Sequence, residues 1–253
     1  MDNERIDKLG ILDLKIIQNK EYFCFGIDSV LLANFVNSNS SKNVILDLCS
    51  GSGVIPIIIS AKKKYSKIFA VELQEKMYEL LDRNIKLNNL EESIIGINED
   101  IKKIDKIKKI IIRETSNGTV DTIVVNPPYK KKGTGIYNPT DIKYIARHEE
   151  MCTLEDVFKT SCVLLNTKGK LYIVHKPERL ADLICIARGY RLEAKKIRLV
   201  YPTKSSKPSI VLVEYVKDGG NEVNILEPLI EFKDDGTYSD EIRNIYDIKK
   251  ENN

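Results

Sequence analysis

Short apolar segments alternate with helical stretches along most of this 253-residue chain, and this alternation constrains the fold more than any other feature. The helical stretch 74–87 repeats its apolar residues at steps of three or four, which is the period of a helix. Strands separated by helices form parallel βαβ units. The sequence therefore predicts an α/β fold. Its first predicted strands are residues 44–49, 68–71, 94–99 and 120–125.

The second half of the chain predicts further helices and strands. Helical patterns cover residues 154–165 and 178–187, and strand patterns cover residues 170–174, 191–201 and 210–216. Only a proline- and serine-containing link joins the last two strands, between Tyr201 and Ser209. So short a link cannot make a parallel crossover, so we expect these two strands to form an antiparallel hairpin.

A glycine turn follows the first predicted strand. Residues 50–53, Ser-Gly-Ser-Gly, lead into a helix-compatible segment, and Asp47 precedes them in the strand. Gly51 and Gly53 permit the backbone conformations and close approach that a ligand over the turn requires. A Gly-x-Gly alone is weak evidence for a nucleotide-binding site, and the third glycine of the dinucleotide-binding fingerprint is missing here. No lysine follows the glycines, so the turn suits a nucleoside without phosphates.

Acidic residues end the next two strands. Glu72 follows residues 68–71, about twenty residues after the glycines, where an acid accepts hydrogen bonds from a ribose diol. Asp100 follows residues 94–99, and we expect it near the adenine of the same ligand. The alternative for Asp100 is an ordinary helix N-cap.

Asn126-Pro127-Pro128-Tyr129, directly after the strand 120–125, is the most specific motif. The two prolines lack N–H donors and fix φ, so the backbone leaves the strand as a stiff loop. The Asn126 side-chain oxygen and the Pro127 carbonyl suit the two hydrogens of a planar NH2 group, while Tyr129 stacks on the attached ring. A strand-ending turn is the ordinary interpretation of Asn-Pro alone. The full tetrapeptide favours an amine-binding site.

Taken in order, these elements resemble the class I S-adenosylmethionine-dependent methyltransferases, in the branch that methylates exocyclic amino or amide nitrogens. Within this branch the chain is most similar to the bacterial tRNA1(Val) adenine N6-methyltransferases, which modify the adenosine 3′ of the anticodon. The resemblance covers nearly the whole chain, including residues 22–33, 145–149, 175–179 and 198–202. Gly26 departs from it, because a serine is expected at that position.

The resemblance implies a Rossmann-like fold with a seven-stranded, mostly parallel sheet, an antiparallel last strand and helices on both faces. The predicted catalytic residues are Asn126, Pro127, Pro128 and Tyr129. The predicted S-adenosylmethionine-binding residues are Phe25, Asp28, Asp47, Ser50, Gly51, Gly53, Glu72, Leu73, Asp100, Ile101 and Asn126. The predicted tRNA-binding residues are Lys130, Lys131, Lys132, Arg147 and His148.

We expect three parts of the chain, the last of which is distinguished by its charge. We expect residues 1–43 to pack over the cofactor site, residues 44–220 to form the catalytic domain, and residues 221–253 to form an acidic extension. From Glu222 onward there are 9 acids and 4 bases, so the net charge of +3 divides into −5 there and +8 before it. A lysine triplet beside the acceptor loop suits a phosphate backbone, although a charge run is most often a solvated face. The polar loop 128–150 is long enough to close over a substrate.

The sequence argues against a disulfide-bonded, a metal-binding and a membrane-spanning protein. The five cysteines (Cys24, Cys49, Cys152, Cys162 and Cys185) are odd in number and scattered, which argues against disulfides and a zinc site. Two histidines are too few and too separate for a metal cluster. No apolar stretch would span a bilayer and the charged start is no signal peptide, so we expect a cytoplasmic protein without a metal or a stable protein partner.

Three alternative functions remain open from the sequence. A protein-glutamine N5-methyltransferase would use the same NH2 chemistry, but such enzymes generally carry an N-terminal helical domain, and only 43 residues precede Val44. A guanine-N2 rRNA methyltransferase more often has Phe at the position of Tyr129. A non-catalytic RNA-binding module is disfavoured by the intact Asn126 and Glu72.

Overall fold

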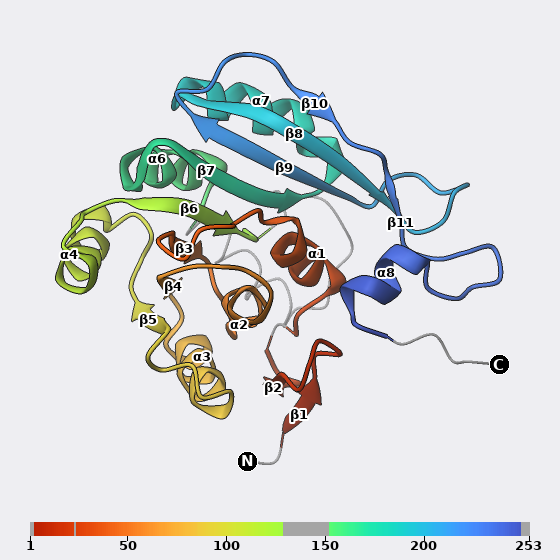
Figure 1. Ribbon diagram of the computed structural model, residues 1–253, viewed down its shortest axis with the longest axis horizontal. Coiled ribbons are helices and arrows are strands. Elements are labelled where there is room, and N and C mark those ends of the chain that lie inside the picture. Colours follow the sequence, from red (N-terminus) through yellow and green to blue (C-terminus); the bar gives the residue numbers. More distant parts are fainter. Residues whose placement is uncertain (1–2, 23, 129–151, 249–253) are drawn as a thin grey trace.

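The computed structural model describes residues 3–22, 24–128 and 152–248, and it confirms the α/β fold (Figure 1). Within these residues the central sheet has nine strands. They are β3 (Val44–Leu48), β4 (Lys67–Glu72), β5 (Ile94–Asn98), β6 (Val120–Val125), β7 (Leu165–His175), β8 (Leu192–Tyr201), β9 (Ile210–Lys217), β10 (Asn224–Ile225) and β11 (Leu229–Ile230).

The main strands follow the order β5-β4-β3-β6-β7-β9-β8. Neighbours from β5 to β7 pair in parallel, whereas β9 is antiparallel to both β7 and β8. The seven-stranded, mostly parallel sheet with an antiparallel last strand is therefore confirmed. Because β9 is inserted antiparallel between β7 and β8, these two strands run in the same direction. The ends of β7 and β8 therefore lie at the same edge as the ends of β3 to β6.

Helices cover both faces of the sheet (Figure 1). One hydrophobic cluster lies under α1 (Ile27–Phe35), α2 (Val54–Lys62) and α3 (Glu75–Leu87), and takes in α8 (Asp240–Ile245). The other lies under α4 (Ile104–Thr115), α6 (Leu154–Leu164) and α7 (Leu180–Gly189), which follows a short 3-10 turn (Pro177–Arg179). The period-2 alternation of each strand supplies both clusters: Ile45 and Val124 face the first, Leu46 and Val125 the second.

An N-terminal hairpin, formed by β1 (Glu4–Lys8) and β2 (Lys15–Asn19), is separate from the central sheet. Buried Asn84 of α3 attaches it: its Oδ1 accepts from Ile17 N (2.6 Å), and its Nδ2 donates to Ile17 O (3.2 Å) and to Ser52 O (2.9 Å). One amide side chain therefore connects the hairpin to the glycine turn.

The strand predicted over residues 170–174 is longer than expected. β7 begins at Leu165, directly after α6, and Leu165 pairs with Val120. The register then shifts before Thr122 pairs with Lys170, and Lys168 has a φ of 63° in this irregular stretch. A bulge rather than a loop therefore joins the two halves of the strand. Residues 166–168 are polar, so the first half of the strand shows no strand pattern in the sequence.

The C-terminal extension closes one end of the sheet. β10 and β11 pair in parallel with β8, and α8 buries Ile242 and Ile245 in the first hydrophobic cluster. Arg198 of β8 donates two hydrogen bonds to the Glu241 carboxylate, at 2.6 and 2.8 Å. The acidic extension is therefore packed and ion-paired against β8 of the central sheet.

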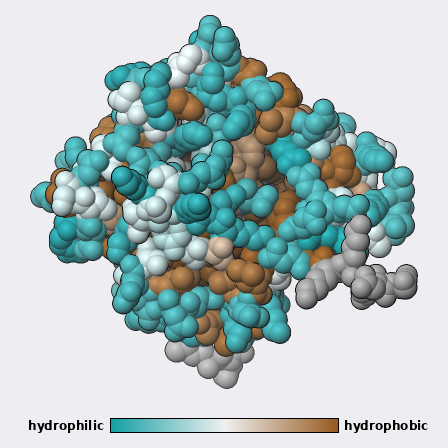
Figure 2. All heavy atoms as spheres, viewed as in Figure 1, coloured by the Kyte–Doolittle hydropathy of each residue, from teal (hydrophilic) through white to brown (hydrophobic). Residues whose placement is uncertain are grey.

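The surface in Figure 2 is mostly hydrophilic, with apolar side chains in separate patches. Large exposed apolar residues are few among those described, and the most exposed are Leu12, Ile225 and Ile6. In the part of the chain that the structure describes, no helix combines the length and the apolar character needed to cross a bilayer.

Candidate active site

The predicted site residues that the structure describes gather at the carboxyl edge of the sheet, where ligands bind in open α/β folds. Leu48 pairs with Val71 on one side and with Val125 on the other. The residues that follow these three strands are therefore neighbours in space. They are the glycine turn after β3, Glu72 at the end of β4, and Asn126 after β6.

The glycine turn adopts conformations that explain its composition. Gly51 has a φ of 58° and Gly53 a φ of 88°, a region in which side chains other than glycine are strained. A Cβ on Gly53 would lie 2.5 Å from Leu81 Cδ1, so α3 packs directly on the turn. Around Gly51 the described residues leave more room, since an added Cβ would meet only Met77 Cε, at 3.8 Å.

Glu72 joins the turn to the start of α3. Its Oε2 accepts from Gly51 N at 2.8 Å, and its Oε1 accepts from Gln74 N at 2.9 Å. Burial raises the pKa of this carboxyl, while the two backbone donors oppose the rise. Each carboxylate oxygen has a further lone pair, so the group can still accept hydrogen bonds from a diol. The sequence did not indicate this second role in shaping the loops.

Asp47 is completely buried beneath the turn. The Ser50 hydroxyl donates to its Oδ2, whereas its Oδ1 has no hydrogen-bond partner among the described residues. Burial, with a smaller contribution from the negative charge of Glu72, raises the pKa of Asp47 to about 8. A buried carboxyl without a full set of partners is costly, and such groups are often found at functional sites.

Asp100 closes the turn after β5, but it is not the helix N-cap of the alternative interpretation, because the N-cap of α4 is Lys103. Asp100 Oδ1 accepts from Lys102 N at 2.9 Å, and its carbonyl accepts from Lys103 N at 2.8 Å. Beside it, Leu73 is partly exposed and Ile101 is buried. Asn98 was not predicted from the sequence. Its Nδ2 donates to Glu72 O (2.9 Å) and Leu73 O (3.2 Å) and so holds β5 to the loop after β4.

Asn126 contacts the N-terminal segment. Its Nδ2 donates to the Ser29 hydroxyl at 2.9 Å. Ser29 lies in the first turn of α1, where Asp28 Oδ1 accepts from its backbone N–H at 3.0 Å. Phe25 N donates to Gln18 Oε1 at 3.1 Å, which ties the segment before α1 to the hairpin. Phe25 and Asp28 were predicted from the sequence but Ser29 was not, although it lies inside the resembling segment 22–33.

Six predicted residues lie outside the described part of the chain. They are Tyr129, Lys130, Lys131, Lys132, Arg147 and His148. The predicted covering loop, residues 128–150, falls outside it as well except for Pro128.

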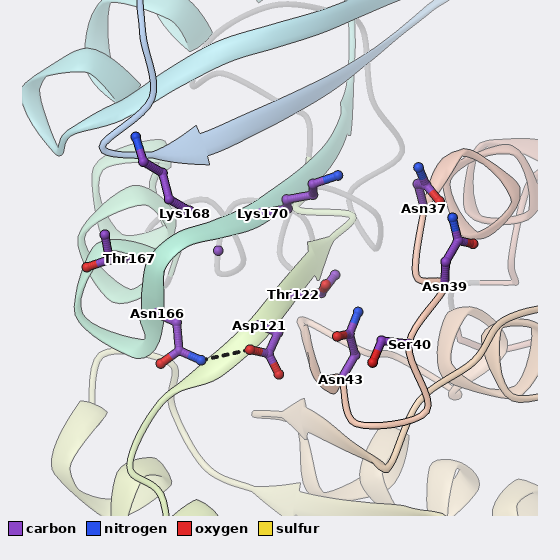
Figure 3. Close-up of a pocket in the computed structure, with 11 residues that line it drawn as sticks. Asn37, Asn39, Ser40, Asn43, Asp121, Thr122, Asn166, Thr167, Lys168 and Lys170 are labelled. Carbon is purple, nitrogen blue, oxygen red and sulfur yellow. Dashed lines mark hydrogen bonds between the residues drawn. The ribbon is translucent and has the colours of Figure 1, made fainter.

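A polar cavity of about 420 Å³ lies at the opposite edge of the sheet, at the amino ends of β3, β6 and β7 (Figure 3). Asp121 is central to its hydrogen bonds: its Oδ1 accepts from Asn166 Nδ2 (2.8 Å), and its Oδ2 accepts from Val44 N (2.9 Å). These bonds fix the starts of the three strands. The cavity is separated from the predicted site by the length of the strands.

The fold just described is similar to that of class I methyltransferases. Residues 28–131 match the family model described as the TRM5/TYW2 methyltransferase domain. A solved structure from Agrobacterium tumefaciens, a predicted O-methyltransferase, aligns with a TM-score of 0.66 at 19% identity, covering 87% of this chain and 95% of that one.

The particular relatives are tRNA1(Val) (adenine(37)-N6)-methyltransferases, which confirms the resemblance expected from the sequence. The one from Porphyromonas gingivalis is 26% identical over 193 residues, which cover 75% of this chain and 73% of the relative. The one from Flavobacterium johnsoniae is 25% identical over 219 residues, which cover 85% of this chain and 87% of the relative.

Proposed function

We propose that this chain transfers the methyl group of S-adenosylmethionine to N6 of an adenosine in tRNA, at the position 3′ of the anticodon, in the cytoplasm. The observation that carries the proposal is the position of Asn126 and Pro127 at the end of β6, beside the edge that holds Glu72 and the glycine turn. The names of the two relatives support the same reaction and the same base.

The described residues fit S-adenosylmethionine. The open side of Gly51 leaves room over the turn, and Glu72 has lone pairs left for the ribose hydroxyls. Asp47 Oδ1 has no hydrogen-bond partner among the described residues and can accept a hydrogen bond from a ligand. We assign the methionine part to Asp47 and the glycine turn, the ribose to Glu72 and the adenine to the region of Asp100. When bound, this group supplies an electrophilic methyl on a sulfonium.

The task of Asn126 and Pro127 is to make a weak nucleophile reactive by position. The lone pair of an adenine amine is delocalised into the ring. The Asn126 side-chain oxygen and the Pro127 carbonyl accept its two N–H bonds, which favours a pyramidal nitrogen with its lone pair directed away from both acceptors. Such positioning can supply on the order of 7 to 11 kcal/mol of barrier lowering. No covalent enzyme intermediate is needed.

Some lysines and arginines of the chain form ion pairs, and others do not do so within the described residues. Four bases in residues 102–109 and 195–198 have acidic partners nearby, so they are less available for phosphates. These pairs are Lys102–Asp100 (3.6 Å), Lys106–Glu99 (2.7 Å), Lys196–Glu214 (3.2 Å) and Arg198–Glu241 (2.6 Å).

Lys204 and Lys207 differ from these paired bases. Both are exposed in the connection between β8 and β9, and neither forms an ion pair within the described residues. Because β8 runs in the same direction as β6, this connection lies at the carboxyl edge, as Asn126 does. We assign to these two lysines the binding of RNA phosphates on this side of the site.

Methyl transfer tests the reaction directly. The protein is incubated with methyl-labelled S-adenosylmethionine and tRNA1(Val) transcript, and the RNA is digested to nucleosides. We expect label in N6-methyladenosine, and none with a transcript that carries guanosine at the target position. Label on a protein glutamine, or as N2-methylguanosine in rRNA, would replace the proposed substrate while keeping the chemistry.

Salt dependence tests the RNA-binding lysines. The double variant Lys204→Gln, Lys207→Gln should bind tRNA more weakly and lower the log-log salt slope by about 0.7 to 0.9 for each phosphate that is no longer neutralised. The matched control is Lys42→Gln, Lys64→Gln, two exposed lysines at the amino edge without an ion pair among the described residues. Equal slopes for the two double variants would remove Lys204 and Lys207 from the interface.

A further inference from the structure

The hydrogen bond between Ser29 and Asn126 links two residues that are 97 positions apart in the sequence. Ser29 is buried, with 6% of its surface exposed, and lies in the first turn of α1. Asn126 lies at the end of β6 and carries the acceptor oxygen in the proposed reaction. The N-terminal segment therefore contacts the side chain on which the proposed chemistry depends.

An asparagine that must accept a hydrogen bond has an orientation problem. Its oxygen and its NH2 group are of similar size, but only the oxygen accepts. If the amide turned over, its NH2 group would face the hydrogens of the target amine and repel them. In the structure the Ser29 hydroxyl accepts an N–H from the amide, whereas with the amide turned over the same hydroxyl would have to donate to the amide oxygen.

We propose that Ser29 is a positioning residue that holds the Asn126 amide with its oxygen toward the target amine. This inference rests on the proposed function. The Ser29 hydroxyl accepts from Asn126 Nδ2 at 2.9 Å, a normal hydrogen-bond length. Because Nδ2 is the amide atom that contacts Ser29, the acceptor in the proposed reaction is the other amide atom, the oxygen.

Ser29 is itself held in place. Asp28 Oδ1 accepts from its backbone N–H at 3.0 Å, and the residues that follow it, Val30 to Ala33, are buried in the first hydrophobic cluster. α1 therefore cannot move without disturbing the core. The backbone that carries the hydroxyl is therefore held in place, and it belongs to the N-terminal segment rather than to the motif-bearing loops.

Threonine and valine have side chains of the same shape, so substituting each for Ser29 tests the hydroxyl alone. Ser29→Thr keeps it, and Ser29→Val replaces it by a methyl group. We expect Ser29→Val, and likewise Ser29→Ala, to lower kcat by up to about 100-fold, the effect of displacing a reacting group by about 1 Å. Ser29→Thr should retain most of the activity. The KM for tRNA and the Kd for S-adenosylmethionine should stay near their wild-type values in all three.

A second measurement separates positioning from packing. In an Asn126→Asp background the two carboxylate oxygens are equivalent acceptors, so no orientation has to be fixed. The loss of kcat caused by Ser29→Ala should therefore largely disappear there. A loss of the same size in both backgrounds would contradict the inference, because Ser29 would then act without regard to the amide.

The outcomes also separate this inference from the proposed function. If the wild-type protein methylates no tRNA, the proposed function fails. If the wild-type protein is active and Ser29→Ala keeps its kcat, or folded Ser29→Thr is as impaired as Ser29→Val, only the role of Ser29 is overturned. Thermal melting of each variant checks that it is folded.

Discussion

Asp47 and Glu72 are buried acids on adjacent strands, and both have pKa values raised chiefly by burial. A fold built for stability alone would place apolar residues there. Both lie beneath and beside the glycine turn, where the proposed function assigns them to a polar ligand. The pH dependence of stability follows from the same burial.

Asp47→Asn should change how stability varies with pH. The folded protein holds the pKa of Asp47 at about 8, against an ordinary value of 3.8. Between these values the folded state retains a proton that the unfolded state has lost, so wild-type stability falls as pH rises toward 8. The Asp47→Asn variant has no ionisable group at this position, so its stability lacks this decline with pH. The stability of the variant relative to wild type should therefore rise from about pH 5 to about pH 8, by a few kcal/mol.

Urea unfolding of the ligand-free proteins at several pH values measures this difference. The same titration of Asp235→Asn serves as a control, because the pKa of exposed Asp235 is lowered, chiefly by a hydrogen bond from Thr237. Parallel stability curves for wild type and Asp47→Asn would show that Asp47 is ionised in the folded protein at neutral pH.

Gly53→Ala should destabilise the turn. The φ of 88° is strained for alanine, and its Cβ would lie 2.5 Å from Leu81 Cδ1 unless that methyl group moves. We expect a loss of about 1 to 3 kcal/mol in the free energy of unfolding. Gly220→Ala is the control, since nothing lies within 4 Å of its added Cβ, and its effect should stay within about 0.5 kcal/mol. Equal effects in chemical denaturation would refute the strain argument.

Some residues of the candidate site could be predicted from the sequence, and others could not. Gly51, Gly53, Glu72 and Asn126 could be selected because each follows an apolar strand in a recognisable order. The supporting side chains could not. Ser29, Asn84 and Asn98 act through partners on other elements, and a single serine or asparagine in a sequence does not indicate which distant group it contacts.

At the scale of elements, period and turn chemistry predicted most of the central strands and helices. The short additional strands were missed for physical reasons. Four of the five residues of β1 are charged, and β10 and β11 have two residues each, so none carries a periodic pattern. They exist because a neighbour offers unpaired backbone groups: β1 pairs with β2, whereas β10 and β11 add to the free edge of β8.

The C-terminal helix offers a test at this scale. Ile242 of α8 is fully buried against the cluster under α1, so Ile242→Ala should lower the free energy of unfolding by about 2 to 5 kcal/mol. Val223→Ala, at a site 47% exposed in the same extension, should change it by less than about 0.5 kcal/mol. Denaturant titrations that give equal midpoints for the two variants would mean that the extension does not contribute to the folded core.

At the scale of the whole molecule, the acids of the C-terminal part and the bases of the rest are not independent. Glu241 neutralises Arg198, so part of the formal +8 of residues 1–221 is cancelled where the extension packs. The charge that remains unpaired at the carboxyl edge includes Lys204 and Lys207. The charge of each segment can be counted from the sequence, but which bases lie at the carboxyl edge without an ion pair among the described residues follows from the strand directions and the pairing of the folded chain.

The assembled site should couple cofactor binding to the stability of the whole domain. Its proposed contacts come from loops after β3, β4 and β5, which an unfolded chain does not bring together. A ligand that binds only the folded state stabilises it by mass action, by about 2.7 kcal/mol at a concentration 100 times its Kd. S-adenosylmethionine should therefore raise the melting temperature in proportion to the logarithm of its concentration.

Methionine alone should raise the melting temperature far less, because it cannot reach Glu72. Glu72→Gln should weaken the effect of S-adenosylmethionine, since its amide accepts fewer hydrogen bonds from the ribose. An equal shift with methionine, or an undiminished shift in Glu72→Gln, would place the ligand away from β4.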